Sequence, residues 1–427
     1  MIKIISAEEF NNKRTIKTTT TEAITKTVAN IISDIINRGD DALREYTEKF
    51  DGCRLERFEL HQADMDDAIN QIDPEFVAIM RRAAANITAY HSKQIKEGFE
   101  MNPSQGITMG QRIIPLKRVG LYIPGGTAAY PSSVLMNVIP AKLAGVEEII
   151  IVTPPSKTGE INPGILAAAQ IAGANRVFAI GGAQAVAALA YGTETIPRVD
   201  KITGPGNAYV AEAKRQVFGI VGIDMIAGPS DILVIADKHA DPRLVAADML
   251  SQCEHGSDSP AVLVTTCAEL ADKVKDEIDK QLKELPREEI ARQAVDNHGM
   301  IIIAQSIDEA FDISNELAPE HLEICLDEPI NYLDKVKSAG SIFLGESTPE
   351  ALCDYYAGPN HTLPTDGTAR FSSPLSVDDF VKKSSYTYYS RQALVEAASD
   401  VIRFAEEEGL TAHAESVRKR VERIKTS

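Results

Sequence analysis

Four polar side chains that could do chemistry stand together in the stretch LSQCEHG, where Gln, Cys, Glu and His occupy positions 252–255. An imidazole is a good zinc ligand and an amide oxygen can also coordinate, whereas a cysteine paired with a histidine can act as a nucleophile. A histidine at the end of a helix also interacts favourably with the last backbone carbonyls. The stretch is therefore compatible with a metal site, a thiol nucleophile or an ordinary helix end.

The helix expected before this stretch indicates which of these side chains can act together. Asp241 suits an N-cap, a proline follows at the first helical position, and Gly256 suits the residue just past the helix end. Gln252 and His255 are three residues apart in the predicted last turn, so they share a face, while the two residues between them point elsewhere. This geometry pairs the glutamine with the histidine and disfavours a Cys–His nucleophile.

A metal at this helix end would need further ligands from other segments. Three more polar clusters interrupt apolar or glycine-rich surroundings: Glu320 and His321 in LAPEHLEI, Asp354 and His361 in CDYYAGPNHTLPT, and Glu408 and His413 in EEEGLTAHAESV. On the residues alone, the first of these is best explained as a polar loop at the start of a strand. The remaining histidines are predicted to be ordinary surface residues: His61, His91, His239 and His298.

The segments that carry these clusters alternate between strand-like and helix-like patterns. From about Lys117, β-rich runs pass through glycine turns into helical runs, as in RVFAIGGAQAVAALA. A second such region contains the strand-like runs AVLVTTCA, MIIIAQS, HLEICL and GSIFLGE. This alternation predicts βαβ units and parallel sheets, an α/β fold. Apolar residues at helical spacing predict further helices near the N-terminus and in the C-terminal tail.

Three glycine turns follow predicted strands, at Gly125-Gly126, Gly181-Gly182 and Gly204-Pro205-Gly206. Open parallel sheets bind ligands at the carboxyl ends of their strands, where such turns bring backbone N–H groups and helix N-termini close together. None of the three is the G-x-G-x-x-G dinucleotide motif, and each could be only a tight turn that needs positive φ. Together they favour a binding cleft without naming its ligand.

Composition limits the possible partners. The chain has 427 residues, enough for two or more domains, and a formal net charge of −18, which makes nucleic acid and anionic membrane poor partners. Its five cysteines are scattered without a C-x-x-C motif, which is typical of a reducing compartment. The N-terminus does not resemble a signal peptide, and the most apolar run, residues 177–192, is short for a membrane span.

Taken in order, eight stretches covering nearly the whole chain resemble the histidinol dehydrogenase family. They are RVGLYIPGG, GGAQAVAALAYGTETIPRVDKITGPGNAYVAEAKRQV, DMIAGPSDILVIAD, LSQCEHGSDS, LAPEHLEI, AGSIFLGESTPEALCDYYAGPNHTLPT, ARFSSPLSVDDF and EGLTAHAESVRKR. The resemblance implies two incomplete Rossmann-like parallel-sheet domains in an intertwined homodimer with shared active sites. The expected parts are an N-terminal arm (1–20), a first α/β domain (21–120 plus 232–378), an NAD-contacting domain (121–231) and a helical C-terminal dimerisation tail (379–427).

Members of this family oxidise L-histidinol to L-histidine through histidinal, with two NAD and one zinc per subunit, in the last step of histidine biosynthesis. The resemblance therefore implies a cytoplasmic NAD-dependent oxidoreductase with Zn2+ and NAD as cofactors and L-histidinol as substrate. Two alternatives are a paralogue that oxidises another small alcohol and a non-catalytic binding module of the same fold. The retained candidate-site residues speak against both.

The resemblance also implies a role for each candidate residue. Its acid–base pair falls on Glu320 and His321, and its zinc ligands fall on Gln252, His255, Asp354 and His413. Its NAD-contacting positions fall on Tyr122, Gln184 and Asn207. Its substrate-binding positions fall on Ser230, Gln252, His255, His321, Asp354, Glu408 and His413, with His361 nearby. On this assignment Cys253 is a bystander, and Cys353 is a departure beside a ligand, where some relatives carry glycine.

Overall fold

The computed structural model describes residues 2–12, 21–125 and 130–426. The chain forms two compact units, one of Met1–Gln94 with Leu116–Phe380 and the other of Ile95–Pro115 with Val381–Ser427. Residues 13–20 of the predicted N-terminal arm and Gly126 of the first glycine turn lie outside the described residues.

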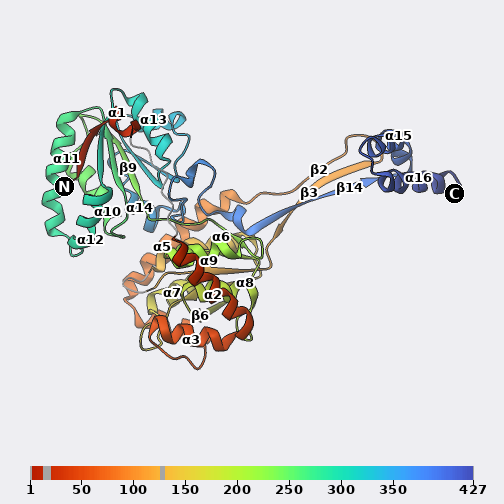
Figure 1. The fold of residues 1–427 in the computed structure, drawn as a ribbon, viewed down its shortest axis with the longest axis horizontal. Coiled ribbons are helices and arrows are strands. Elements are labelled where there is room, and N and C mark those ends of the chain that lie inside the picture. The colour runs from red at the N-terminus through yellow and green to blue at the C-terminus, as the bar shows by residue number, and fades with distance from the viewer. Residues whose placement is uncertain (1, 13–20, 126–129, 427) are drawn as a thin grey trace. The chain divides into compact units, whose positions relative to one another are not determined.

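One part of the first unit is a six-stranded parallel sheet with the order β1-β11-β10-β9-β12-β13 (Figure 1). Its strands are β1 (Lys3–Ser6), β9 (Ile232–Ala236), β10 (Ala261–Thr265), β11 (Met300–Ile303), β12 (His321–Cys325) and β13 (Ser341–Leu344). Every residue of β9 is buried, which explains its continuous apolar sequence ILVIA. One face packs on α10 (Pro242–Cys253), α11 (Ala268–Gln281) and α12 (Glu288–His298), and the other on α1 (Ala7–Asn12) and α13 (Ile307–Leu317).

The other part of the first unit is a five-stranded parallel sheet with the order β6-β5-β4-β7-β8. Its strands are β4 (Arg118–Tyr122), β5 (Glu148–Thr153), β6 (Arg176–Ala179), β7 (Lys201–Thr203) and β8 (Gly222–Ile223). One face packs on α4 (Gln62–Ala68), α5 (Pro74–His91), α6 (Pro131–Ala144) and α7 (Pro163–Ala172). The opposite face packs on α2 (Glu22–Arg38), α3 (Asp40–Asp51), α8 (Gly182–Tyr191) and α9 (Ala208–Val217). The predicted α/β fold with parallel sheets is confirmed.

Helices α2 to α5 pack on the five-stranded sheet and not on the six-stranded sheet, with which the predicted domain division groups them. The predicted division groups residues 21–120 with 232–378, but the apolar faces of these helices contribute to the cores around the five-stranded sheet. In α2, for example, Val28, Ile31 and Ile35 pack with the alanine-rich α8. The helical period fixes which side chains share a face, but it does not say which surface that face meets.

The second unit is an antiparallel sheet followed by two helices. The strands are β2 (Phe99–Met101), β3 (Ile107–Pro115) and β14 (Val381–Tyr389), and the helices are α15 (Arg391–Glu407) and α16 (Thr411–Thr426). The tail 379–427 was expected to be helical, but its first part forms the strand β14. The sequence YTYY at the end of this strand is rich in aromatic and β-branched residues, which favour strands. Gly409, with φ +74, separates α15 from α16.

Within the described ranges, no helix combines the length and the apolar character that a membrane span requires.

Candidate active site

Gln252 and His255 are linked by a backbone hydrogen bond at the end of α10, because His255 lies just beyond the helix. Asp241 caps the helix N-terminus as predicted, but the helix ends at Cys253, two residues before the end expected from Gly256 as the residue just past it. His255 lies in the following turn, where its N–H donates to the carbonyl of Gln252 at 3.1 Å. The helix stops early because this tighter hydrogen bond replaces the next helical one.

The Gln252 side chain is fully buried, and neither its amide nitrogen nor its amide oxygen has a hydrogen-bond partner of ordinary geometry. The Glu350 carboxyl lies nearby. Burial raises its pKa, and the Gln252 amide acts in the opposite direction. A buried amide without partners costs free energy, so it calls for an explanation such as a bound ligand or ion. By contrast, burial raises the pKa of the Cys253 thiol to about 12, which does not suit a thiolate nucleophile.

Glu320 and His321 are buried at the start of β12, beside Asp231 at the start of β9. The Asp231 N–H donates to Glu320 Oε2 at 3.1 Å, and the Glu320 N–H donates to Asp231 Oδ1 at 2.9 Å. His321 Nδ1 lies 2.8 Å from the Asp231 carbonyl oxygen. Because a carbonyl only accepts, Nδ1 carries a hydrogen, and Nε2 is the ring atom that can exchange a proton.

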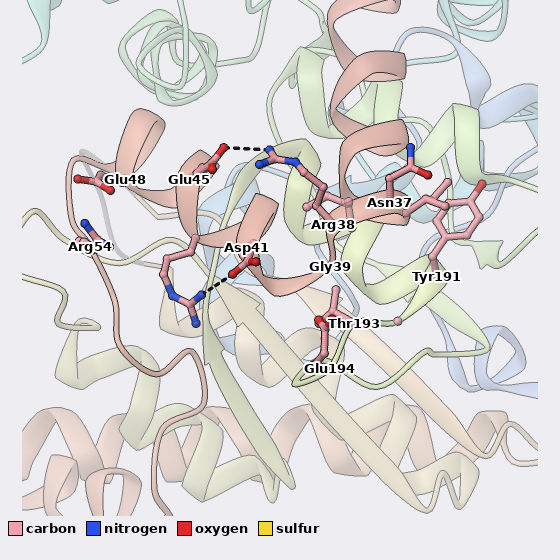
Figure 2. Close-up of a pocket in the computed structure, with 14 residues that line it drawn as sticks. Asn37, Arg38, Gly39, Asp41, Glu45, Glu48, Arg54, Tyr191, Thr193 and Glu194 are labelled. Carbon is pink, nitrogen blue, oxygen red and sulfur yellow. Dashed lines mark hydrogen bonds and ion pairs between the residues drawn. The ribbon is translucent and has the colours of Figure 1, made fainter.

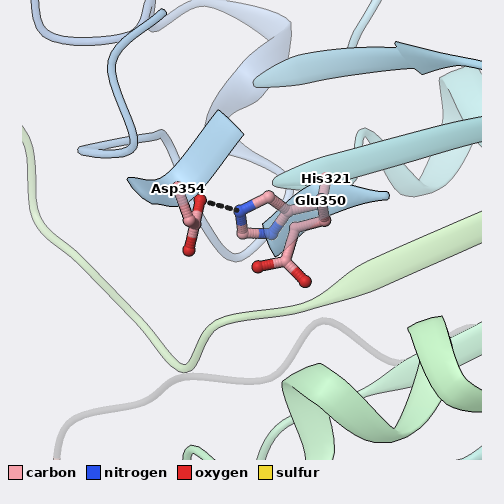
Figure 3. Close-up of side chains that lie close together, drawn as sticks. All are labelled: His321, Glu350 and Asp354. Carbon is pink, nitrogen blue, oxygen red and sulfur yellow. Dashed lines mark ion pairs between the residues drawn. The ribbon is translucent and has the colours of Figure 1, made fainter. Parts of the chain in front are cut away.

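His321 Nε2 points toward Asp354, with Oδ1 at 3.8 Å, and has no hydrogen-bond partner (Figure 3). Asp354 belongs to η5, a single π-helical turn (Cys353–Ala357), and Glu350 begins the short α14 (Glu350–Leu352) before it. His321, Glu350 and Asp354 have ligand atoms within 4.8 Å of one another, so this group of the described residues could hold a metal ion.

The burial of these groups changes their acid–base behaviour. Burial raises the pKa of Glu320 to about 8. Burial acts to lower the pKa of His321, but the Glu320 and Asp354 carboxylates outweigh it and raise that pKa above its ordinary value. Neighbouring protein atoms lower the pKa of His255, although its ring reaches the surface, and the charge of Asp354 opposes them. His255 therefore lies within electrostatic reach of Asp354.

His361 contacts the π-helical turn that carries Asp354. Its Nδ1 donates to the backbone carbonyl of Asp354 at 2.9 Å, and its Nε2 lies 3.1 Å from the Ser133 hydroxyl on α6. Ser230 lies one residue before Asp231, directly ahead of β9. The structure thus gathers the candidate residues of the six-stranded sheet at the amino ends of β9 and β12 and the end of α10.

Tyr122 and Gln184 lie at the carboxyl edge of the five-stranded sheet. Tyr122 ends β4, and its hydroxyl accepts a hydrogen bond from the Gly182 N–H at 3.1 Å. Gln184 is only 1% exposed, and both atoms of its amide lack a partner. Of the described glycines in the three turns, only Gly182 (φ +66) and Gly204 (φ +111) have the predicted positive φ. A buried polar side chain without a partner again marks a predicted site.

Asn207 and the Gly204 turn complete this edge. Asn207 caps α9, its Oδ1 accepting from the N–H groups of Tyr209 and Val210 at 3.0 and 3.2 Å. A Cβ on Gly204 would lie 2.0 Å from the Tyr122 carbonyl oxygen, so only glycine lets this turn approach β4 so closely.

Glu408 and His413 belong to the second unit. Glu408 is the C-cap of α15, and His413 lies in the first turn of α16, with both side chains exposed. Among the histidines predicted to lie on the surface, His91 is an exception. It is fully buried at the end of α5, with Nδ1 2.7 Å from Gln94 Oε1.

One cavity is lined by none of these residues. It has a volume of about 1160 Å³ and is lined by the end of α2, the start of α3 and the loop after α8 (Figure 2). Two of its arginines already pair with carboxylates of the same lining, Arg38 with Glu45 at 2.9 Å and Arg44 with Asp41 at 3.4 Å. We therefore assign the chemistry to the buried groups around His321 and not to this cavity.

Asp231 and Glu350 are site residues that sequence reasoning missed. Glu350 carried a usable signal, because it stands four residues before Asp354 and such a pair shares a face of a helical turn. Asp231 carried none, since its contact with Glu320 joins segments far apart in the sequence.

Comparison with known proteins gives consistent matches. The sequence model of the family described as histidinol dehydrogenase matches residues 14–421. Histidinol dehydrogenase of Streptococcus mutans is 56% identical, covering 92% of this chain and 91% of its own, and that of Listeria monocytogenes is 52% identical, covering 92% of both chains. The crystal structure of histidinol dehydrogenase from Elizabethkingia anophelis has a TM-score of 0.93 at 39% identity, covering 99% of this chain and 98% of its own.

Proposed function

Since the chain belongs to the histidinol dehydrogenase family, whose members are NAD-dependent oxidoreductases, we propose that it oxidises L-histidinol through histidinal to L-histidine with two NAD and one zinc per subunit. The observation that carries the proposal is the cluster of His321, Glu350 and Asp354, whose ligand atoms lie within 4.8 Å of one another. The buried Gln252 amide, which has no hydrogen-bond partner of ordinary geometry, lies beside Glu350. A bound ligand or ion would account for buried polar groups without partners.

The proposed zinc ligands are Gln252, His255, Asp354 and His413. The donor set suits the ion, since imidazole, carboxylate and amide oxygen all coordinate zinc. Because only one of these ligands is a carboxylate, a bound ion would keep a net positive charge and would supply an attraction for the imidazole and amine of the substrate. Ser230, Glu408 and His361 are proposed to complete the substrate site, the Glu408 carboxylate suiting a cationic group.

Glu320 and His321 are the proposed acid–base pair. The Asp231 carbonyl keeps a hydrogen on His321 Nδ1, so in the neutral ring, the form present above its raised pKa, Nε2 is positioned to take the hydroxyl proton as the alcohol is oxidised. The second oxidation needs a water molecule to add to the aldehyde, and Glu320, ionised above its pKa of about 8, can take a proton from that water. NAD, when bound, accepts the hydride of each oxidation.

The proposed NAD site is the edge formed by Tyr122, Gln184 and Asn207. Numbered within the five-stranded sheet, the strand order is 3-2-1-4-5, which matches the first five strands of a Rossmann fold and supports an incomplete version of it. In such sheets the ligand binds where the strand order reverses, here between β4 and β7. Tyr122 ends the first of these strands, and the Gly204 turn and Asn207 follow the second.

We also propose a cytoplasmic homodimer in which the second unit contacts a second copy of the chain. In this unit the only described buried hydrophobic side chains are alanines, at 393, 398, 405 and 414, which is too small a core for independent stability. Larger side chains are exposed instead, including Phe99, Met101, Tyr388 and Phe404. Such a surface typically packs on a partner. All five cysteines are free thiols, which supports the reducing cytoplasm.

Shared active sites can be tested by subunit complementation. Dimers of His321→Ala and dimers of His413→Ala should each be inactive. If His413 enters the partner's site, subunit exchange creates heterodimers with one intact site, and activity should return to about a quarter of the wild-type value at full exchange. Exchange is verified with two differently tagged chains, and no recovery despite exchange would refute sharing.

The proposed function itself is tested by following NADH with zinc-loaded protein and L-histidinol. We expect two NADH for each histidinol consumed and L-histidine as the product. Turnover of another alcohol but not of histidinol would refute the proposal and favour the paralogue.

A further inference from the structure

Asn137 is a fully buried polar residue in the middle of α6, a helix whose other central residues are mostly apolar. Its side chain makes three hydrogen bonds to three different segments. Nδ2 donates to the Ser133 carbonyl of its own helix at 2.9 Å and to the Thr362 hydroxyl at 3.3 Å. Oδ1 accepts from the Thr203 hydroxyl at 2.8 Å. The amide therefore links two segments that are distant in sequence.

Both of these segments lead directly into the proposed sites. Thr203 ends β7 and is followed by Gly204, which opens the turn that carries Asn207. Thr362 follows His361, whose ring holds the backbone of Asp354. Thr203 is fully buried and Thr362 is 5% exposed. One amide thus connects the end of the cofactor turn to the loop behind the metal and substrate residues.

Other bonds fix the loop to the same helix. Asn360 Nδ2 donates to the Met136 carbonyl at 2.6 Å, and Asn360 Oδ1 accepts from the Thr362 N–H at 2.9 Å. The Ser133 hydroxyl lies 3.1 Å from His361 Nε2. Several hydrogen bonds therefore join α6 to the loop. In the described part of the chain, the only side-chain hydrogen bond between α6 and β7 is the one from Thr203 to Asn137.

We propose that Asn137 is a positioning residue that fixes the separation between the cofactor turn and the loop carrying His361. The inference rests on the proposed function, in which a hydride passes between groups held by these two segments. Such transfer requires the reacting atoms to lie about 3–3.5 Å apart, and a misplacement of about 1 Å can cost on the order of 100-fold in rate. Buried hydrogen bonds suit this task because few alternative partners exist around them.

The experiment removes one hydroxyl on each side of the amide, with Thr203→Val, Thr362→Val and the double variant. Because Thr203 provides the single connection to β7, Thr203→Val should lower kcat roughly 10-fold, while NAD and zinc still bind. If the two bonds act in series, the double variant should be no slower than Thr203→Val. The deuterium isotope effect on kcat, measured with histidinol deuterated at the carbinol carbon, should rise as hydride transfer becomes slower.

Two matched variants separate positioning from loss of stability. Thr203→Ser keeps the hydroxyl and should keep kcat near the wild-type value. Thr265→Val removes another fully buried threonine hydroxyl at a strand end, one that bonds only its local Cys267 N–H at 3.1 Å. It should lower the melting temperature without changing kcat or the isotope effect.

Unchanged kcat and isotope effect in Thr203→Val, or losses that multiply in the double variant, would overturn the proposal. If the wild-type protein does not oxidise histidinol at all, the proposed function fails first. In that case, the melting temperatures of the wild type, the two single valine variants and the double variant test whether Asn137 couples Thr203 to Thr362. Additive shifts in melting temperature would show that Thr203 and Thr362 are not connected through Asn137.

Discussion

Replacing His321 with asparagine is expected to lower kcat by roughly 10²–10⁴-fold while the protein stays folded. The asparagine Nδ2 occupies nearly the position of the imidazole Nδ1, so it can still donate to the Asp231 carbonyl, which the histidine approaches at 2.8 Å. The group that is lost is Nε2, which points toward Asp354 and is the proposed proton acceptor. Both kcat and the melting temperature are measured, with histidinol and separately with histidinal as substrate.

The neighbouring Glu320→Gln provides the matched control for this result. Glutamine keeps an oxygen that can accept the Asp231 N–H, but it cannot take a proton from water. If the roles are divided as proposed, Glu320→Gln should slow histidinal oxidation more than histidinol oxidation, and fewer than two NADH should form per histidinol in early turnover. Full activity of His321→Asn, or equal effects of Glu320→Gln on both steps, would contradict the assignment.

The sequence predicted elements well where local patterns decide them. The strands around Val234, Leu263 and Ile302 are continuous apolar runs because both faces of the sheet are covered. The N-cap at Asp241 was also predictable, because aspartate is a favoured N-cap residue and a proline follows it at the first helical position. The end of the same helix was not, since a turn at His255 competes with one more helical turn.

Contacts between distant segments could not be derived from local patterns. The pairing of β3 with β14 joins two parts of the chain that carry no mutual signal, and it places residues 95–115 with the C-terminal tail. The proposed NAD site lies at the carboxyl ends of its strands, whereas the proposed metal and substrate site lies at the amino ends of its strands. The glycine turns follow the rule for carboxyl ends, whereas Asp231 and His321 lie at the amino ends of β9 and β12. The candidate residues were identified by family resemblance, because local patterns alone do not reveal which distant segments meet.

The metal prediction has the largest expected effect, because His255→Ala should lose both bound zinc and nearly all activity. His255 is exposed in a turn after α10, so its removal leaves no cavity in the core, and the melting temperature of the metal-free protein should change little. Zinc per subunit is measured by elemental analysis, and activity is measured before and after chelation. Chelation of the wild-type protein should abolish activity, and added zinc should restore it.

His239→Ala is the matched control, since His239 is also exposed and follows β9 at the edge opposite to the candidate site. It should keep one zinc per subunit and wild-type kcat. Gln252→Leu tests the buried ligand independently, because leucine fills a similar volume without the unpartnered amide. If the amide is retained only to hold the ion, this variant should be at least as stable as wild type without metal and should bind zinc more weakly. Full zinc content in both His255→Ala and Gln252→Leu would mean that the ion is held elsewhere, with His321, Glu350 and Asp354 as the next set to test.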